Sequence, residues 1–196
     1  MFPEKIIFIG LAISLFCTIW YIWNIFKKGV RPNLVSWFIW MLAPFVGVIL
    51  SLKAGAGLSI FGTFMAGFTP LLVILISLFK KNAFWKINAF DLLCGLFAVL
   101  ALFIYVLTKN LNISILFAIL SDGLAAIPTI IKSWKFPNTE TSSVYLGGIV
   151  NNIFSLLVIK NWSFPIYSFS IYLIVINIVI IFSIYHKKMV YLKNEK

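Results

Sequence analysis

The sequence predicts an all-α, polytopic integral membrane protein in which seven transmembrane helices form two three-helix bundles joined by a linker helix. Its 196 residues are 62% hydrophobic and only 11% charged, and the mean hydropathy is +1.07. A soluble domain of this length does not need so apolar a composition for its core. The apolar residues also fall into seven runs, each about the length that crosses the hydrocarbon core of a bilayer.

Short polar breaks separate the seven runs. The first run is long enough to span and lacks the cleavage site of a signal peptide, so we expect it to be a retained helix. We expect residues 1–79 and 111–185 to form the two bundles, with the linker helix in 80–110 and a basic cytoplasmic tail at 186–196. The predicted spans are Ile6–Phe26, Leu34–Leu52, Leu58–Phe79, Ile87–Leu107, Leu111–Ile131, Ser142–Ile159 and Pro165–Tyr185.

The basic residues predict the orientation of these spans. Alternate loops place four cations on one side of the membrane and twelve on the other. Cytoplasmic loops carry the excess of Lys and Arg, so we expect an inner-membrane protein with its N-terminus outside and its C-terminus in the cytoplasm. The net charge of +11 therefore indicates topology and lipid contact and not nucleic-acid binding. The twelve are Lys27, Lys28, Arg31, Lys80, Lys81, Lys86, Lys132, Lys135, Lys187, Lys188, Lys193 and Lys196.

The two halves of the chain also share a layout. Aligning Pro32-Asn33 with Pro137-Asn138 places a tryptophan upstream of a basic loop in each half, Trp23 in the first and Trp134 in the second. Two three-helix repeats in the same orientation require one inverting helix between them. This layout predicts the three, one and three arrangement of the helices.

The second half carries a motif that resembles the PQ-loop group, which includes the SWEET sugar transporters and cystinosin and shares its fold with the KDEL receptors. In those proteins a Pro-Gln pair near the cytoplasmic end of a helix precedes a Ser-Thr-Glu-Gly turn that opens the next helix. Here Pro128-Thr129 is followed by Asn138, Thr139 and Glu140 at a similar spacing. The chain resembles a divergent member of this group, because Thr129 stands in place of the glutamine and the first repeat lacks the proline of the motif.

The resemblance implies which residues act as hinges. Prolines within the helices of SWEET-like proteins serve as rocking points, and Pro44, Pro70 and Pro128 are the candidates here. Proline also frees a backbone carbonyl and bends a helix, which membranes tolerate where the backbone lines a cavity. A static kink is the alternative at each position.

Two acids lie within apolar runs and lead to different expectations. Asp122 lies midway along the fifth span, where an ionised carboxylate costs about 2.5–3.5 kcal/mol on insertion scales and must face the interior or be protonated. We expect it to be a proton, cation or substrate site, with a hydrogen-bonded structural carboxyl as the alternative. Asp91 lies one turn into the fourth span, where we expect a structural ion pair with nearby Lys86 or Lys81.

Neutral polar groups occur on the last two spans. Asn151, Asn152 and Asn177 each offer two donors and an acceptor, which suits a polyhydroxyl or amide ligand; hydrogen bonding between helices is the alternative. The resemblance assigns a solute-binding asparagine to the third helix of a unit, which is the position of Asn177. Trp37 and Trp40 share one helix face. We expect them to anchor the helix at the membrane interface. The alternative is that they cap a cavity, in which case Trp40 contacts the solute.

These residues favour a transporter or facilitator of a small polar solute, such as a sugar, amino acid or vitamin, that works by alternating access. The alternative is a membrane receptor like the KDEL receptors, or a lipid-binding or structural membrane protein without net transport. We expect no enzyme, metal or cofactor, because the sequence has no paired acids, Cys/His ligand spacing or nucleophile motif. The expected partners are the solute, membrane lipids and a second copy of the chain.

Overall fold

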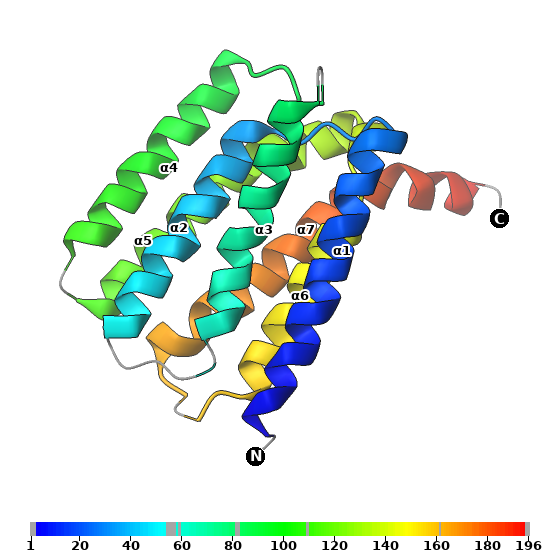
Figure 1. Ribbon diagram of the computed structural model, residues 1–196. Helices are drawn as coiled ribbons and strands as arrows, with labels where there is room; N and C mark the ends of the chain where they lie inside the picture. Colours follow the sequence, from blue (N-terminus) through cyan, green and yellow to red (C-terminus); the bar gives the residue numbers. More distant parts are fainter. Residues whose placement is uncertain are drawn as a thin grey trace.

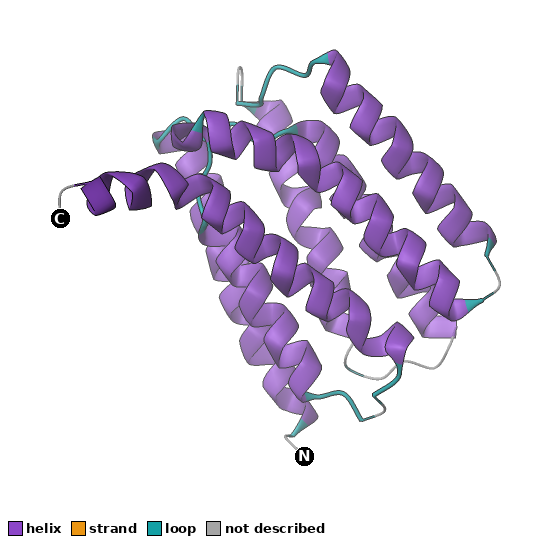
Figure 2. Ribbon diagram, turned by 180° about the vertical axis from the view of Figure 1, so that it is seen from behind, coloured by secondary structure: helices purple, strands orange, loops and turns teal. Residues whose placement is uncertain are grey.

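The computed structural model describes residues 3–53, 58, 60–80, 83–108, 110–160 and 162–194. Within them the chain is helical and contains no strand, as the sequence predicts (Figures 1 and 2). Two short 3₁₀ helices, η1 at Glu4–Ile6 and η2 at Pro137–Thr139, precede α1 and α6. The α-helices are α1 (Ile7–Lys27), α2 (Leu34–Lys53), α3 (Ile60–Phe79), α4 (Ala89–Leu107), α5 (Leu111–Lys135), α6 (Ser143–Leu157) and α7 (Phe164–Asn194).

Local polar contacts set several helix ends. Asn88 and Asp91 form a reciprocal capping box that starts α4, and Asn110 accepts hydrogen bonds from the first amides of α5. Both satisfy donors that a helix N-terminus leaves open. After α1 the chain turns at Gly29, whose φ of 71° favours a residue without a Cβ.

The seven predicted spans correspond one to one with the seven α-helices. The ends differ by a turn or less for most of them, but α7 runs on to Asn194 through the segment that the sequence assigned to a separate tail. The sequence places the end of that span where apolar residues give way to lysines, yet helical hydrogen bonding continues past that point. Within the described residues, five helices are long and apolar enough to cross a membrane, whereas α6 and the segment Leu34–Phe45 of α2 are shorter apolar helices.

The helices pack in a definite neighbour order. The middle position in each half belongs to its third helix: α3 packs against both α1 and α2, and α7 packs against both α5 and α6. The halves meet where α1 lies along α6 and α2 lies along α5. Helix α4 lies outside this ring, against α5 and α2 (Figure 1).

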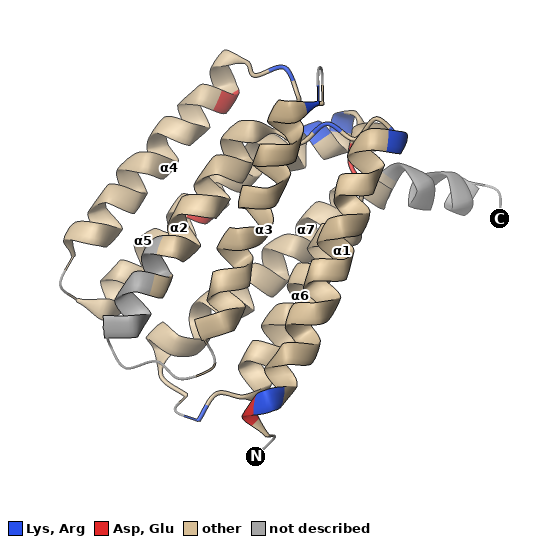
Figure 3. Ribbon diagram, viewed as in Figure 1, with Lys and Arg blue, Asp and Glu red and all other residues tan. Residues whose placement is uncertain are grey.

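Polar and apolar side chains are distributed as in a membrane protein. Large hydrophobic side chains are exposed along most helices, whereas buried positions include many Ser, Thr and Asn residues. Lipid solvates the apolar exterior, and polar groups are kept where they find partners in the interior. The Lys and Arg residues gather mainly at the end of the bundle where α1 ends and α2 begins, which we call the basic end (Figure 3).

Candidate functional site

A cavity of about 80 Å³ lies between the two halves. Side chains from every helix except α4 line it, so it lies inside the ring of six helices. The residues are Ser14 of α1; Trp37, Trp40 and Pro44 of α2; Met65, Ala66, Thr69 and Pro70 of α3; Asp122 of α5; Val144, Tyr145, Gly148, Asn151 and Asn152 of α6; and Leu173, Ile176, Asn177 and Ile180 of α7.

All five residues that the sequence singles out for solute binding line this one cavity. They are Asp122, Asn151, Asn152, Asn177 and Trp40. They come from four helices, and the first and last of them, Trp40 and Asn177, are separated by more than two thirds of the chain. The sequence could select these residues only one at a time, mainly because burying a polar group in a membrane is costly. The structure brings them together.

Asp122 is held from two sides and is 2% exposed. Tyr172 Oη on α7 donates a hydrogen bond to its Oδ2, 2.8 Å away. The indole Nε1 of Trp40 donates to the backbone oxygen of Asp122 at 3.3 Å, which joins α2 to α5. Neither ion pair in the described part of the chain involves Asp122, so its carboxylate faces the cavity without a cationic partner.

Each of the three asparagines uses its amide nitrogen to bond a backbone carbonyl. Asn151 Nδ2 donates to Gly62 O across to α3 at 3.1 Å, and Asn152 donates to Gly148 O at 2.8 Å. Asn177 donates to Leu173 O at 2.7 Å. Each amide nitrogen has a second N–H, so both the nitrogens and the side-chain oxygens are left for a ligand.

Two of the three predicted hinge prolines also line the cavity. Pro44 in α2 and Pro70 in α3 are among the lining residues, whereas Pro128 is buried in α5 away from it. A proline leaves the carbonyl four residues earlier without its helical partner. Pro44 and Pro70 therefore interrupt the backbone hydrogen bonding of α2 and α3 at the level of the cavity.

The two tryptophans of α2 are buried inside the bundle. Trp37 is 1% exposed and Trp40 is 9% exposed, so the expectation of an interfacial anchor is wrong for both. Their rings contact each other at 5.6 Å between centroids, and both contact the ring of Tyr145. These aromatic rings form one wall of the cavity.

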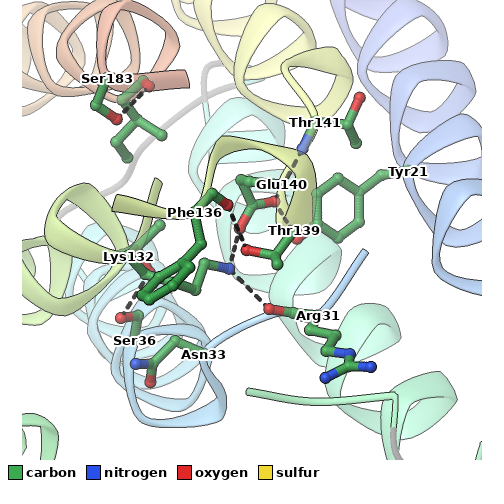
Figure 4. A network of polar contacts seen from close by, with 12 residues as sticks. Tyr21, Arg31, Asn33, Ser36, Lys132, Phe136, Thr139, Glu140, Thr141 and Ser183 are labelled. Carbon is green, nitrogen blue, oxygen red and sulfur yellow. Dashed lines mark hydrogen bonds and ion pairs between the residues drawn. The ribbon is translucent and has the colours of Figure 1, made fainter. Parts of the chain in front are cut away.

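A buried polar network lies on the basic-end side of this wall (Figure 4). Lys132 of α5 and Glu140 form an ion pair at 2.5 Å. Tyr21 of α1 donates to Glu140 Oε1 at 2.5 Å, and Lys132 Nζ donates to the Arg31 carbonyl at 2.7 Å. The ion pair belongs to the second half of the chain, and its hydrogen bonds with Tyr21 and Arg31 reach the first half.

Two further contacts cross between the halves at this level. Arg31 N donates to Thr139 O at 2.9 Å, so the two loops that the repeat aligns are bonded to each other. Thr129 Oγ1 of α5 donates to Ser36 Oγ of α2 at 2.9 Å. We call the set Tyr21, Arg31, Ser36, Thr129, Lys132, Thr139 and Glu140 the interhalf network.

The motif residues have different positions in this network. Glu140 is at its centre, and Thr139 contributes its carbonyl while its hydroxyl bonds Phe136 O at 2.7 Å. Asn138 is exposed. Thr129 stands where the PQ-loop group has glutamine. Its hydroxyl donates the hydrogen bond to Ser36 of α2.

Two expectations for charged residues are wrong. Lys132 is 3% exposed and is a buried partner of Glu140, although the sequence counts it among the loop cations. Asp91 has the structural role that the sequence predicts, but it caps α4 with Asn88, whose backbone N–H donates to its Oδ2 at 3.0 Å, and does not pair with Lys86. Lys81, the other expected partner, lies outside the described residues. In both cases the charged side chain bonds one specific neighbour, Glu140 for Lys132 and Asn88 for Asp91.

Sequence reasoning also missed three tyrosines. Tyr172 bonds Asp122, Tyr21 bonds Glu140, and Tyr145 lines the cavity. Tyrosine is common at membrane interfaces, so its presence near a helix end carries little information. A better signal is a tyrosine well inside an apolar run, such as Tyr172, because its hydroxyl needs a buried partner.

Within the described residues, no group of three or more His, Cys, Asp or Glu side chains could hold a metal ion. Comparisons of the chain with protein-family models, with curated proteins and with solved structures found no match in any of the three. The likeness to the PQ-loop group therefore rests on the motif and the helix count alone.

Proposed function

We propose that this protein is a membrane transporter that moves a small polar solute by alternating access. Two three-helix units, α1–α3 and α5–α7, rock against each other around the cavity between them, and α4 links them. The neighbour order of the helices supports this division, since α3 and α7 each pack between the two other helices of their half. It is also the division that the resemblance to SWEET-like proteins implies.

One observation carries the proposal: a cavity whose lining includes polar side chains lies between the halves, and the interhalf network lies on its basic-end side. Residues of both halves line the cavity, so a relative movement of the halves changes access to it. The buried Lys132–Glu140 pair bonds the first half through Tyr21 and Arg31. Opening the cavity toward the basic end requires these bonds to separate.

The distribution of charge supports an orientation for this movement. The basic end corresponds to the cytoplasmic side, because positively charged loops are retained there. The conformation described here is then closed toward the cytoplasm. The N-terminus lies outside, and the helical extension of α7 beyond Tyr185 lies at the cytoplasmic face.

Uptake into proteoliposomes tests the proposal. We expect at least one radiolabelled solute from a panel of glucose, glycerol, glycine and ethanolamine to accumulate in molar excess over the protein. The double variant Asp122→Ala, Asn177→Leu should reduce this uptake about tenfold or more, because it removes two lining groups. Asp91→Asn is the matched control, since Asp91 is a buried acid on α4 outside the cavity and asparagine can keep its capping bond.

Uptake by the double variant at the rate of the unaltered protein would contradict the proposal. Saturable binding of a solute without uptake above the binding stoichiometry would favour the alternative function, a receptor on the same scaffold.

A further inference from the structure

Two lining residues offer strong hydrogen-bond acceptors to a ligand, through the carboxyl group of Asp122 and Oδ1 of Asn151. The amide nitrogens of Asn151, Asn152 and Asn177 each donate one hydrogen bond to a backbone carbonyl, and each keeps a second N–H. Asn151 Oδ1 is buried and has no partner. An orphaned acceptor of this kind costs free energy unless a ligand or water donates to it.

The cavity also carries a carboxyl group that has no cation beside it. Asp122 lines it, and no lysine or arginine is among the lining residues. The pairs Lys132–Glu140 and Lys160–Glu4 are the ion pairs found among the described residues, and neither faces the cavity. Burial of a carboxylate without a cation is costly in hydrocarbon, so a positively charged ligand offsets that cost and a negatively charged one adds to it.

Aromatic rings complete the lining on one side. Trp37, Trp40 and Tyr145 are all lining residues, and the Trp40 ring is joined to the backbone of Asp122 by its indole nitrogen. The faces of such rings attract cations. The indole N–H of Trp37 is buried without a partner, which provides a donor for a hydroxyl oxygen on the same ligand.

The volume limits the size of this ligand. The cavity of about 80 Å³ is roughly half of the 150 Å³ that accommodates benzene in an engineered protein cavity. A hexose does not fit within it. An amino acid is smaller, but its carboxylate would meet Asp122 without a cation to balance it.

We propose that the cavity binds a small primary ammonium compound, of the size and chemistry of a short amino alcohol. The ammonium group donates to Asp122 and to Asn151 Oδ1, and the Trp37 N–H donates to the hydroxyl. The physiological role of this binding rests on the proposed function, because a transporter would release the ligand when its two halves rearrange. As a statement about binding it stands independently of transport.

Binding to the purified protein in detergent tests the inference, with ethanolamine as the probe and ethylene glycol as its neutral counterpart of similar shape. Ethanolamine should raise the melting temperature in a saturable manner, and ethylene glycol at equal concentration should not. Asp122→Asn should weaken ethanolamine binding about tenfold or more, because it removes a charge-assisted hydrogen bond. Asp91→Asn should leave the affinity unchanged.

The comparison of the two probes on the unaltered protein needs no variant, so it remains decisive if Asp122→Asn does not fold. An equal response to ethanolamine and ethylene glycol overturns the inference. Stabilisation by sodium chloride that fully replaces the ethanolamine effect also overturns it, because the site is then one for an inorganic cation only.

Uptake measurements separate this inference from the proposed function. Ethanolamine binding without uptake supports the ammonium site and overturns transport. Uptake of glucose or glycerol without ethanolamine binding supports transport and overturns the ammonium site.

Discussion

At the scale of single residues, Glu140 illustrates how a buried charge is stabilised in this bundle. Its carboxylate accepts from Lys132 and Tyr21, and its side chain is fully buried. A buried charge that keeps all its partners is tolerated, whereas one that loses its partner is strongly destabilising. The pair is therefore expected to behave as a unit when it is mutated.

A double-mutant cycle tests this expectation. Glu140→Gln and Lys132→Met should each lower the free energy of unfolding by roughly 3–5 kcal/mol, because each leaves an unpaired buried charge. The double variant should be less destabilised than the sum of the two. Thermal unfolding in detergent measures this, and strictly additive losses would show that the two side chains do not interact.

The sequence could select residues of this kind but not their partners. The spacing of the motif points to Glu140, and the cost of burial points to Asp122 and the asparagines. Tyr21 and Lys132 escape notice because their partners are distant in sequence or because a lysine near a helix end suggests a loop cation. Which residues meet across the bundle depends on helix rotation, which a single sequence does not fix.

At the scale of elements, close helix contact depends on glycines whose role the sequence leaves open. A Cβ on Gly147 of α6 would lie 2.7 Å from Cys17 Cβ and 3.2 Å from Ser14 Cα of α1. A Cβ on Gly148 would instead meet the end of the Asn177 side chain at 2.9 Å. The first glycine lets two helices approach, and the second leaves space beside the cavity.

Alanine at each of these neighbouring positions should therefore have a different effect. Gly147→Ala should lower the free energy of unfolding by about 1–3 kcal/mol, since the backbone of α1 must move to relieve overpacking. Gly148→Ala should cost less stability, because Asn177 can change its rotamer, but should weaken solute binding. Equal melting temperatures for the two variants would contradict this assignment.

The helices themselves are the part of the fold that the sequence predicts well. Continuous apolar runs bounded by charges determine each span, and caps such as Asn88 and Asn110 refine the ends. The end of α7 is missed because apolar content reports where a membrane ends and not where helical hydrogen bonding ends. The order in which the helices pack follows from contacts between distant segments and is seen only in the structure.

At the scale of the whole molecule, the proposed transport function depends on the cavity and the interhalf network together. The cavity lies between the halves, and the network joins the halves at the basic end. If transport occurs by alternating access, the halves must separate where the network now holds them. A covalent bond at that place should then stop transport and leave the binding site intact.

The most direct test of this account is a reversible disulfide across the network. Ser36 Oγ and Thr129 Oγ1 lie 2.9 Å apart on α2 and α5, so cysteines at both positions are within reach of a disulfide. The variant Ser36→Cys, Thr129→Cys would be made in a background in which alanine replaces Cys17 and Cys94, the two native cysteines. Ser36→Cys alone, treated in the same way, is the matched control.

The measurement is solute uptake by proteoliposomes after oxidation and again after reduction. The account predicts that oxidation abolishes uptake by the double-cysteine variant, that dithiothreitol restores it, and that solute binding persists in the oxidised protein. Unchanged uptake by protein whose disulfide is shown to have formed would contradict the claim that the two halves separate at the basic end during transport.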